Sequence, residues 1–492
     1  MQRVKGRQLE FVFAVNPKGD SQARALDKAK AWLSHIANFK ESKNLTTTAT
    51  DKLLEQVVTS SNLAKALLNV ARNKGAAGVD GVSVKEVVEK AKSLLPKLQH
   101  MLLNGKYQPG EIRRVWIPKP GGEKRGLGIP NVIDRWVQQA VHQVLEPIID
   151  PTFHDSSHGF RPNRGAHTAI AEAKMYVEAG YKIVVDIDLS KFFDRVNHQR
   201  LLNRLALHVK DGRVLKLIHQ MLKAKVVLPD GTKVNVEEGT PQGGNLSPLL
   251  SNIVLDELDW ELARRGLCFV RYADDCNIYV KSKRSGIRVM DSTQKFIEKR
   301  LRLKINKEKS RVITFNSYQS SFLGFRISKS KDGEFQINPS EKSKRKVRDK
   351  IKELTPRVWG QSLKACIEKL NSYLQGWEAY FDVCNGFSNT KHFFKQTDAH
   401  VRRRLRAIII KQKKRKRHLF RHLIQRGVYR DIAAQTAFSS KGYWRKSNMK
   451  GINLAYRNRW FSDRLVSVWK LWARRHIVFE KVQGDSQLLL SF

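Results

Sequence analysis

Acidic side chains inside strand-like stretches constrain the fold of this chain more than any other feature of its sequence. The stretch 182–189 carries Asp186 and Asp188, which the two-residue period of a strand places on one face. Downstream, Asp274 and Asp275 occupy a turn between two further strand-like runs. An isolated Asp-Asp pair is usually an ordinary turn, because aspartate hydrogen-bonds to its own backbone there. Carboxylates that converge from separate strands repel one another unless cations lie between them, so the pattern predicts a site for a hard divalent cation such as Mg²⁺.

The apolar pattern places strands in the middle of the chain, with helices between and after them. The strand-like segments are 114–122, 127–130, 182–189, 226–236, 268–280 and 311–327. Helical spacing of apolar residues occurs at 23–36, 51–71 and 132–145. Strand patterns stop after about residue 340, so we predict an α+β fold. A length of 492 residues predicts roughly two to four domains.

The charge of the chain indicates a polyanionic partner. Its 92 Lys and Arg residues against 46 Asp and Glu residues give a formal net charge of +46, which favours nucleic acid. An anionic membrane surface is the competing partner, but no apolar run approaches the roughly 18 residues of a membrane span, so we expect no membrane role. The excess is strongest in 391–460, where 21 Lys or Arg residues face only Asp398 and Asp431. Aromatic residues interleave with these cations, and both together suit phosphates and unpaired bases.

Cysteine usage points to a reducing compartment. The four cysteines have neither the paired spacing of a zinc site nor the pattern of a disulfide framework, and they are Cys268, Cys276, Cys366 and Cys384. The basic N-terminus is not followed by the apolar segment of a secretory signal. We therefore expect a cytoplasmic protein.

Short motifs follow one another along nearly the whole chain. In order, they are 73–81, 117–122, 127–130, 159–162, 188–194, 239–248, 272–275, 303–309 and 322–325. The most specific are Gly-Thr-Pro-Gln-Gly-Gly-Asn-Leu-Ser-Pro at 239–248 and Tyr-Ala-Asp-Asp at 272–275. In kind and order these motifs resemble the reverse transcriptases encoded by bacterial group II introns, also called intron maturases. The segments 370–377 and 401–405 resemble the maturase-specific thumb region of that family, and 442–460 resembles its closing segment.

The resemblance implies a right-hand polymerase: fingers, an antiparallel-sheet palm, a helical thumb and a basic helical C-terminal segment. The expected domains are an N-terminal extension at 1–60, fingers at 61–180, the palm at 181–340, a helical thumb or maturase domain at 341–440 and a basic C-terminal segment at 441–492. No zinc endonuclease module is visible after Trp460, so we do not expect this chain to cut DNA.

The catalytic residues that the resemblance implies are Asp188, Asp274 and Asp275. Asp188 is chosen over Asp186 because it stands five positions before Phe193, the spacing found in the family. The implied metal ligands are Asp188, Asp274, Asp275 and the backbone carbonyl of Leu189. Two Mg²⁺ ions are the implied cofactors, with Mn²⁺ as a substitute.

The resemblance also implies a set of nucleotide-binding residues: Lys119, Arg125, Phe193, Gln242 and Lys309. Lys119 and Arg125 flank a glycine turn, where two cations can grip a triphosphate. Phe193 would occupy the space of a ribose 2′-hydroxyl; its alternative is a core aromatic beside Phe192. Gln242 would contact the incoming nucleotide. Lys309 would assist the pyrophosphate, an assignment that the neighbouring lysines leave open. The chain departs from many relatives in having Asn245 where they have proline.

Nucleic acids are the implied partners: intron RNA, an RNA template with a DNA primer, and target DNA, together with deoxynucleoside triphosphates. The residues expected to bind nucleic acid are Arg402, Arg403, Arg404, Lys413, Lys414, Arg415, Lys416 and Arg417. The function predicted is RNA-directed DNA synthesis for a group II intron, with binding of intron RNA to assist splicing and mobility. Two alternatives stay open: a maturase that only binds RNA, and a polymerase recruited for host DNA repair or defence. The three aspartates favour an enzyme, since a binding protein has no need of mutually repelling carboxylates.

Overall fold

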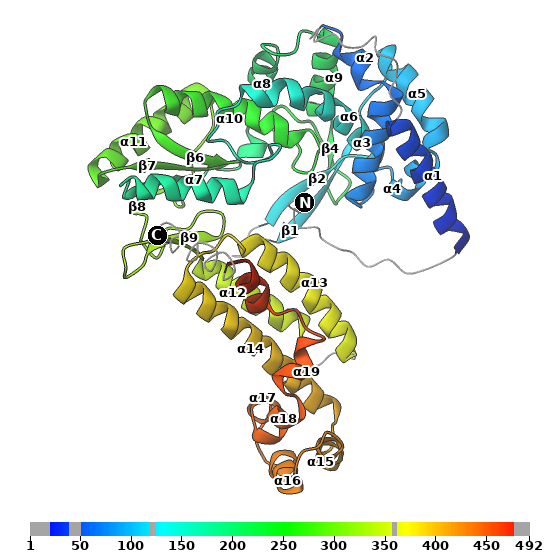
Figure 1. The fold of residues 1–492 in the computed structure, drawn as a ribbon. Helices are drawn as coiled ribbons and strands as arrows, with labels where there is room; N and C mark the ends of the chain where they lie inside the picture. The colour runs from blue at the N-terminus through cyan, green and yellow to red at the C-terminus, as the bar shows by residue number, and fades with distance from the viewer. Residues whose placement is uncertain (1–19, 39–50, 119–121, 123, 357–361, 477–492) are drawn as a thin grey trace, which may run out of the picture. The chain divides into compact units, whose positions relative to one another are not determined.

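The computed structural model describes residues 20–38, 51–118, 122, 124–356 and 362–476 (Figure 1). The chain divides into two compact units, Met1–Ile313 and Thr314–Phe492. Among the described residues, no helix combines the length and the apolar character needed to span a bilayer. The domain boundaries expected from the resemblance stay predictions.

Helices build the N-terminal part of the first unit: α1 (Asp20–Asn38), α2 (Leu53–Val57), α3 (Ser60–Arg72), α4 (Val84–Glu89), α5 (Ala91–Leu103) and α6 (Val132–Ile149). The prediction of one helix over 51–71 is wrong. Thr59 interrupts it, because its side chain accepts a hydrogen bond from the Asn62 N–H at 3.3 Å and so caps the start of α3. The helix predicted over 132–145 is confirmed, and its buried Trp136 donates to the Leu63 carbonyl at 2.7 Å. These contacts join α6 to α3 in one apolar core.

A first sheet has the strand order β2-β1-β4-β5. Its strands are β1 (Ile112–Pro118), β2 (Lys124–Ile129), β4 (Val226–Val227) and β5 (Lys233–Val234). The two strands predicted around the basic glycine turn are confirmed as β1 and β2, which pair antiparallel. The continuous strand predicted over 226–236 is wrong, because a turn with Gly231 at φ +87° splits it into two short strands.

The second sheet carries the acidic residues and has the order β6-β7-β3-β8. Its strands are β3 (Ile183–Ile187), β6 (Cys268–Tyr272), β7 (Asp275–Val280) and β8 (Arg311–Thr314). The central strand β7 pairs antiparallel with both β3 and β6. Figure 1 shows the sheet with three helices packed around it, α7 (Ala166–Glu178), α10 (Ser247–Arg264) and α11 (Lys283–Phe296). The helices α8 (His198–Leu205) and α9 (Gly212–Leu222) complete the unit together with short turns at Asp150–Thr152, Phe192–Asp194 and Ile297–Leu301.

The second unit is mainly helical. It begins with the antiparallel pair β9 (Phe325–Lys329) and β10 (Phe335–Pro339), so the single strand predicted over 311–327 is wrong: β8 and β9 are separate strands in different sheets. Long helices follow, α12 (Glu341–Leu354), α13 (Leu363–Phe381) and α14 (Phe387–Gln412). Shorter helices come next, α15 (Lys416–Gln425), α16 (Arg430–Phe438), α17 (Tyr443–Lys446), α18 (Lys450–Ala455) and α19 (Asn458–Ser462). A last helical stretch covers 468–476. The prediction that strands stop near 340 is confirmed for the residues described here.

Candidate active site

The acidic turn joins β6 to β7. Tyr272 and Asp275 pair across the hairpin, so that Ala273 and Asp274 form its two-residue loop. Ala273 has φ +56°, a left-handed conformation that costs a residue with a side chain about 1–2 kcal/mol. Such a conformation persists only where its surroundings hold it.

Arg271 is the residue that holds this turn from beneath. It is fully buried, and its guanidinium donates to the Ala273 carbonyl at 2.9 Å. The same group donates to the Asp259 carboxylate at 2.6–2.9 Å and to the Ser157 hydroxyl at 2.7 Å. A further donation, at 3.0 Å, goes to the side-chain oxygen of Asn252. Because the buried charge is both paired and hydrogen-bonded, the network can fix the turn without leaving an orphaned donor.

The motif at 159–162 packs against the same turn. A Cβ atom on Gly159 would lie 2.3 Å from the Ala273 nitrogen, so only glycine fits there. The Asn252 side chain donates to the Gly159 carbonyl at 2.8 Å, and the His158 N–H donates to the Arg271 carbonyl at 2.9 Å. Sequence reasoning named the motif but missed Arg271, Asn252 and Ser157 as its partners. The one available signal was an arginine inside an otherwise apolar strand.

Asp188 lies just beyond the end of β3, with its backbone held on both sides. Its N–H donates to the Ser310 hydroxyl at 3.0 Å, and its carbonyl accepts from the Asn306 N–H at 2.8 Å. The Lys309 ammonium lies 3.8 Å from its carboxylate, so the structure brings these two predicted site residues together. Asp186 instead pairs with Arg311 on β8 at 3.3 Å. The two aspartates of this strand therefore have different partners.

Like charge accumulates around the turn. Exclusion of water by the neighbouring protein, followed by repulsion from Asp274 and Asp188, raises the pKa of the Asp275 carboxyl to about 7, although this residue is exposed. Burial, followed by repulsion from Asp188, also raises the pKa of Asp274. The three carboxylates thus lie within electrostatic reach of one another.

The fit of this cluster to a metal ion can be judged from its donors. The Asp188 charge raises the pKa of both Asp274 and Asp275, and such carboxylate oxygens are the hard, negatively charged ligands that a divalent cation stabilises. Within the part of the chain that the structure describes, however, no group of three or more His, Cys, Asp or Glu side chains is close enough to form a complete metal site. The donor atoms thus have the chemistry that a divalent cation requires, but the described side chains do not form a complete coordination shell.

Arg125 and Gln242, two of the predicted nucleotide-binding residues, contact each other. The Arg125 guanidinium on β2 donates to the Gln242 side-chain oxygen at 2.9 Å. The Gln242 carbonyl accepts from the Gly128 N–H at 2.8 Å, which ties this loop to β2. Arg125 also counters the rise in the pKa of Asp274, so its positive charge reaches the acidic turn. Lys119 lies outside the described residues.

Phe193 lines a pocket of about 370 Å³ together with residues of 224–241. Its ring is half-buried and contacts Phe192 edge to face, with the ring centroids 5.2 Å apart. Both interpretations of Phe193 therefore keep support: it borders an open space, and it packs against a core aromatic. Leu189 is buried and forms a single β-bridge with Ile305.

Asn245, the departure from many relatives, is bound to α6. Its backbone N–H donates to the Gln138 side chain and its amide to the Gln139 side chain, both at 2.9 Å. The substitution thus adds two hydrogen bonds that proline has no donors to make.

Some basic residues of the second unit contact other parts of that unit, whereas others are exposed. Arg404 donates to the Thr355 hydroxyl at 2.8 Å and to the Lys352 carbonyl at 3.2 Å, so its guanidinium links α14 to the end of α12. Arg403 stacks on Trp444, 4.1 Å from the ring centroid. Arg402 lines a pocket. The cluster Lys413, Lys414, Arg415, Lys416 and Arg417 lies where α14 gives way to α15, and all but Lys413 are exposed.

Comparison with known proteins matches two parts of the chain to known families. Residues 117–327 match the family "Reverse transcriptase (RNA-dependent DNA polymerase)", and residues 344–427 match the "Group II intron, maturase-specific domain". Protein YkfC of Escherichia coli (strain K12) is 33% identical over 350 residues, 63% of this chain and 91% of YkfC. The group II intron-encoded protein LtrA of Lactococcus lactis subsp. cremoris is 30% identical over 353 residues, 58% of either chain. A solved chain from a partial Cas6-RT-Cas1–Cas2 complex has 22% identity and a TM-score of 0.32, over 50% of this chain and 42% of that one, too weak a likeness to bear on the fold.

Proposed function

This chain belongs to the bacterial group II intron-encoded reverse transcriptases and maturases, and we propose that Asp188, Asp274 and Asp275 form its catalytic centre. Its reverse transcriptase domain makes it an RNA-directed DNA polymerase, and its maturase domain gives it a role in intron splicing. The observation that carries the proposed centre is the hairpin turn that sets Asp274 beside Asp275, where burial, followed by the charges of Asp274 and Asp188, raises the pKa of Asp275.

Divalent metal ions are the general cofactors of this family. Here the proposed ligands are the three aspartates and the Leu189 carbonyl, holding two Mg²⁺ ions or Mn²⁺ in their place. When bound, such ions would stabilise negative charge on the attacking and leaving oxygens. The hard oxygen donors and their mutual repulsion support this assignment.

The chain's own residues would position the reactants. In the reaction, the primer 3′-hydroxyl attacks the α-phosphorus of a deoxynucleoside triphosphate, the bond to the β-phosphate oxygen breaks, and pyrophosphate leaves. Arg125 is the described cation that could grip the triphosphate, and its contact with Gln242 orients it beforehand. Lys309, beside Asp188, would meet the departing pyrophosphate. Phe193 would exclude a ribose 2′-hydroxyl from the pocket that it lines.

The proposed partners are intron RNA, an RNA template with a DNA primer, and target DNA, and the proposed location is the cytoplasm. The exposed cluster 414–417 supports a role in contacting phosphates. A maturase that only binds RNA is the less favoured alternative. The acidic turn that Arg271 holds favours an enzyme, since binding RNA does not require carboxylates that repel one another.

The test is primer extension by the purified full chain on an RNA template with Mg²⁺. We expect deoxynucleotide incorporation that a chelator abolishes and that an added excess of Mg²⁺ restores. If RNA is bound but no nucleotide is added with either Mg²⁺ or Mn²⁺, the polymerase assignment is wrong and the binding-only alternative takes its place.

A further inference from the structure

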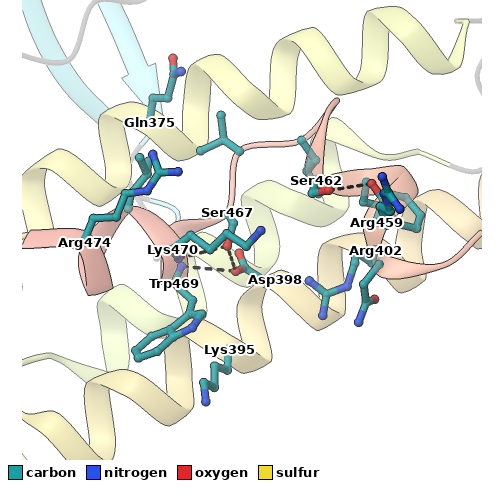
Figure 2. A pocket seen from close by; sticks show the side chains of 15 residues that line it. Gln375, Lys395, Asp398, Arg402, Arg459, Ser462, Ser467, Trp469, Lys470 and Arg474 are labelled. Atoms are coloured by element: carbon teal, nitrogen blue, oxygen red, sulfur yellow. Dashed lines mark hydrogen bonds between the residues drawn. The ribbon is translucent and has the colours of Figure 1, made fainter. Parts of the chain in front are cut away.

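A pocket of about 680 Å³ lies in the second unit, and its lining contains none of the residues of the proposed catalytic centre (Figure 2). Its walls come from α13, from α14 and from the chain between Asn458 and Arg474. Its volume falls within the range of about 300–1,000 Å³ that is usual for ligand sites. The pocket is therefore large enough for a molecule much bigger than a simple ion.

Five cationic side chains line this pocket: Lys395, Arg402, Arg459, Lys470 and Arg474. Among the described residues, none of them forms an ion pair within 4.0 Å or donates a side-chain hydrogen bond. Most are exposed at the rim, where Figure 2 shows Arg474 on one side of the view and Arg402 and Arg459 on the other. The rim thus presents positive charge that has no ion-pair partner among the described residues.

The single carboxylate in the lining, Asp398, is engaged elsewhere. Its oxygens accept from the Ser467 hydroxyl at 2.6 Å and from the backbone N–H groups of Val468 and Trp469 at 3.0 and 3.3 Å. Asp398 therefore caps the last helical stretch, 468–476. Its carboxylate is hydrogen-bonded to N–H groups at the start of that helix, which have no acceptor within the helix. The pocket keeps a net positive charge.

Apolar side chains form the inner wall. They are Phe461, Leu465, Val466, Trp469 and Leu471. The Trp469 indole is half-buried, with the Lys395 ammonium 4.7 Å from its ring centroid. A site for a simple anion needs no such wall. Cations around an apolar wall with an aromatic face instead suit a ligand that carries a flat ring and a phosphate.

We propose that this pocket binds one unpaired nucleotide of a single-stranded nucleic acid, with its base against the apolar wall and its phosphates at the cationic rim. A duplex keeps its bases stacked inside and would leave the apolar wall empty. The proposal rests on the proposed function, which brings the chain into contact with RNA and DNA strands. It adds a binding site for an unpaired strand, built from residues other than those of the proposed catalytic centre.

The test compares two RNA hairpins of equal length in binding to the full chain, one fully paired and one with a single bulged nucleotide. The pocket variant is Lys470→Gln with Arg474→Gln. The matched control, Lys413→Gln with Lys414→Gln, removes the same charge outside the pocket.

We expect the wild type to favour the bulged RNA and the pocket variant to lose about tenfold affinity for it, with little loss for the paired RNA. The control variant should weaken both RNAs by the same factor. Corresponding DNA hairpins show whether the pocket distinguishes the sugar.

Equal losses on both RNAs in the pocket variant would mean that these cations only contact backbone, and would overturn the proposal. Displacement of the bulged RNA by poly-glutamate as readily as by oligouridylate would assign the pocket to an acidic polypeptide instead. If the variant unfolds, a 4-thiouridine bulge is cross-linked to the wild type: attachment to a residue that lines the pocket supports the proposal, and attachment elsewhere refutes it. A wild type that fails in primer extension but shows this binding pattern would refute the polymerase assignment and leave the pocket standing.

Discussion

The acidic turn and the basic helical unit use charge in opposite ways. Beneath the turn, the Arg271 guanidinium is buried, and each of its nitrogen atoms donates a hydrogen bond. In the second unit, the cations of 414–417 are exposed, and those of the pocket rim form no ion pairs among the described residues. Chemistry requires atoms at fixed distances, whereas binding to a polyanion is a sum over many contacts. Single substitutions should therefore matter at the turn, and only combined ones in the basic unit.

The largest expected effect comes from Asp274→Ala. It removes a proposed metal ligand but only one of 46 acidic residues, so DNA synthesis should fall by about 10²–10³-fold or more while RNA binding stays nearly intact. The measurements are primer-extension rate and RNA affinity. Asp186→Asn is the control, because Asp186 pairs with Arg311; it should keep clear residual activity. Equal loss in both variants would show that the assignment of Asp188 over Asp186 is wrong.

In the basic unit, five substitutions together should produce a large change in salt dependence. Neutralising Lys413, Lys414, Arg415, Lys416 and Arg417 should reduce the slope of log affinity against log salt by about two to four units, at roughly 0.7–0.9 per phosphate contact. Extension at saturating template should persist. Filter-binding isotherms across a salt series measure the slope, and identical slopes for variant and wild type would mean that this cluster is only solvated surface.

Glu378 is a second carboxyl whose pKa is raised mainly by burial, as that of Asp275 is, but it is not part of the proposed catalytic centre. It is buried in α13, and burial raises its pKa to about 7 against the opposing charge of Arg475. The folded state thus holds a proton that the unfolded state loses near pH 4.5, so the contribution of Glu378 to stability is largest below that pH and falls as pH rises toward 7, by about 1.4 kcal/mol per unit at most. Glu378→Gln should remove this decline, in unfolding measured from pH 5 to 8. The Asp382 charge also raises this pKa, but Arg475 pairs with both carboxylates, so added Mg²⁺ should leave the difference between variant and wild type unchanged.

Support of the turn can be tested through Asn252→Ala. The change removes an acceptor from Arg271 and a donor from the Gly159 carbonyl, so we expect about a tenfold lower kcat with an unchanged template affinity. Asn252→Asp keeps the acceptor and should recover part of the rate. A fall in template affinity equal to the fall in kcat, with no recovery in the aspartate variant, would point to general loss of folding instead.

The smallest effect is expected at Phe193. Phe193→Val should open the pocket that its ring lines and raise the ratio of ribonucleotide to deoxynucleotide incorporation about fivefold, which corresponds to about 1 kcal/mol of discrimination. Single-nucleotide extension with each sugar measures this ratio. An unchanged ratio would return Phe193 to the role of a core aromatic packed on Phe192.

Local patterns predicted the elements that alternate strictly, and they failed where distant contacts decide. The strand before Asp188 and the two strands on either side of Asp274 were predicted because period-two alternation and turn residues are local properties. The split at Thr59 was missed because helical spacing continues through the cap. Arg271 was missed because an arginine in a strand is ordinarily exposed, and its acceptors Ser157, Asn252 and Asp259 belong to other segments of the chain.

The bond between Arg271 and Ser157 also has a consequence for biosynthesis. The two residues are 114 positions apart, so at typical synthesis rates of about 5–20 residues per second Ser157 leaves the ribosome roughly 6–23 s before Arg271 is made. During that interval the 156–160 segment has no strand to dock on. We therefore expect the ability to synthesise DNA to arise abruptly and late during translation, and a nascent chain that ends before the acidic turn to carry Asp188 without any activity.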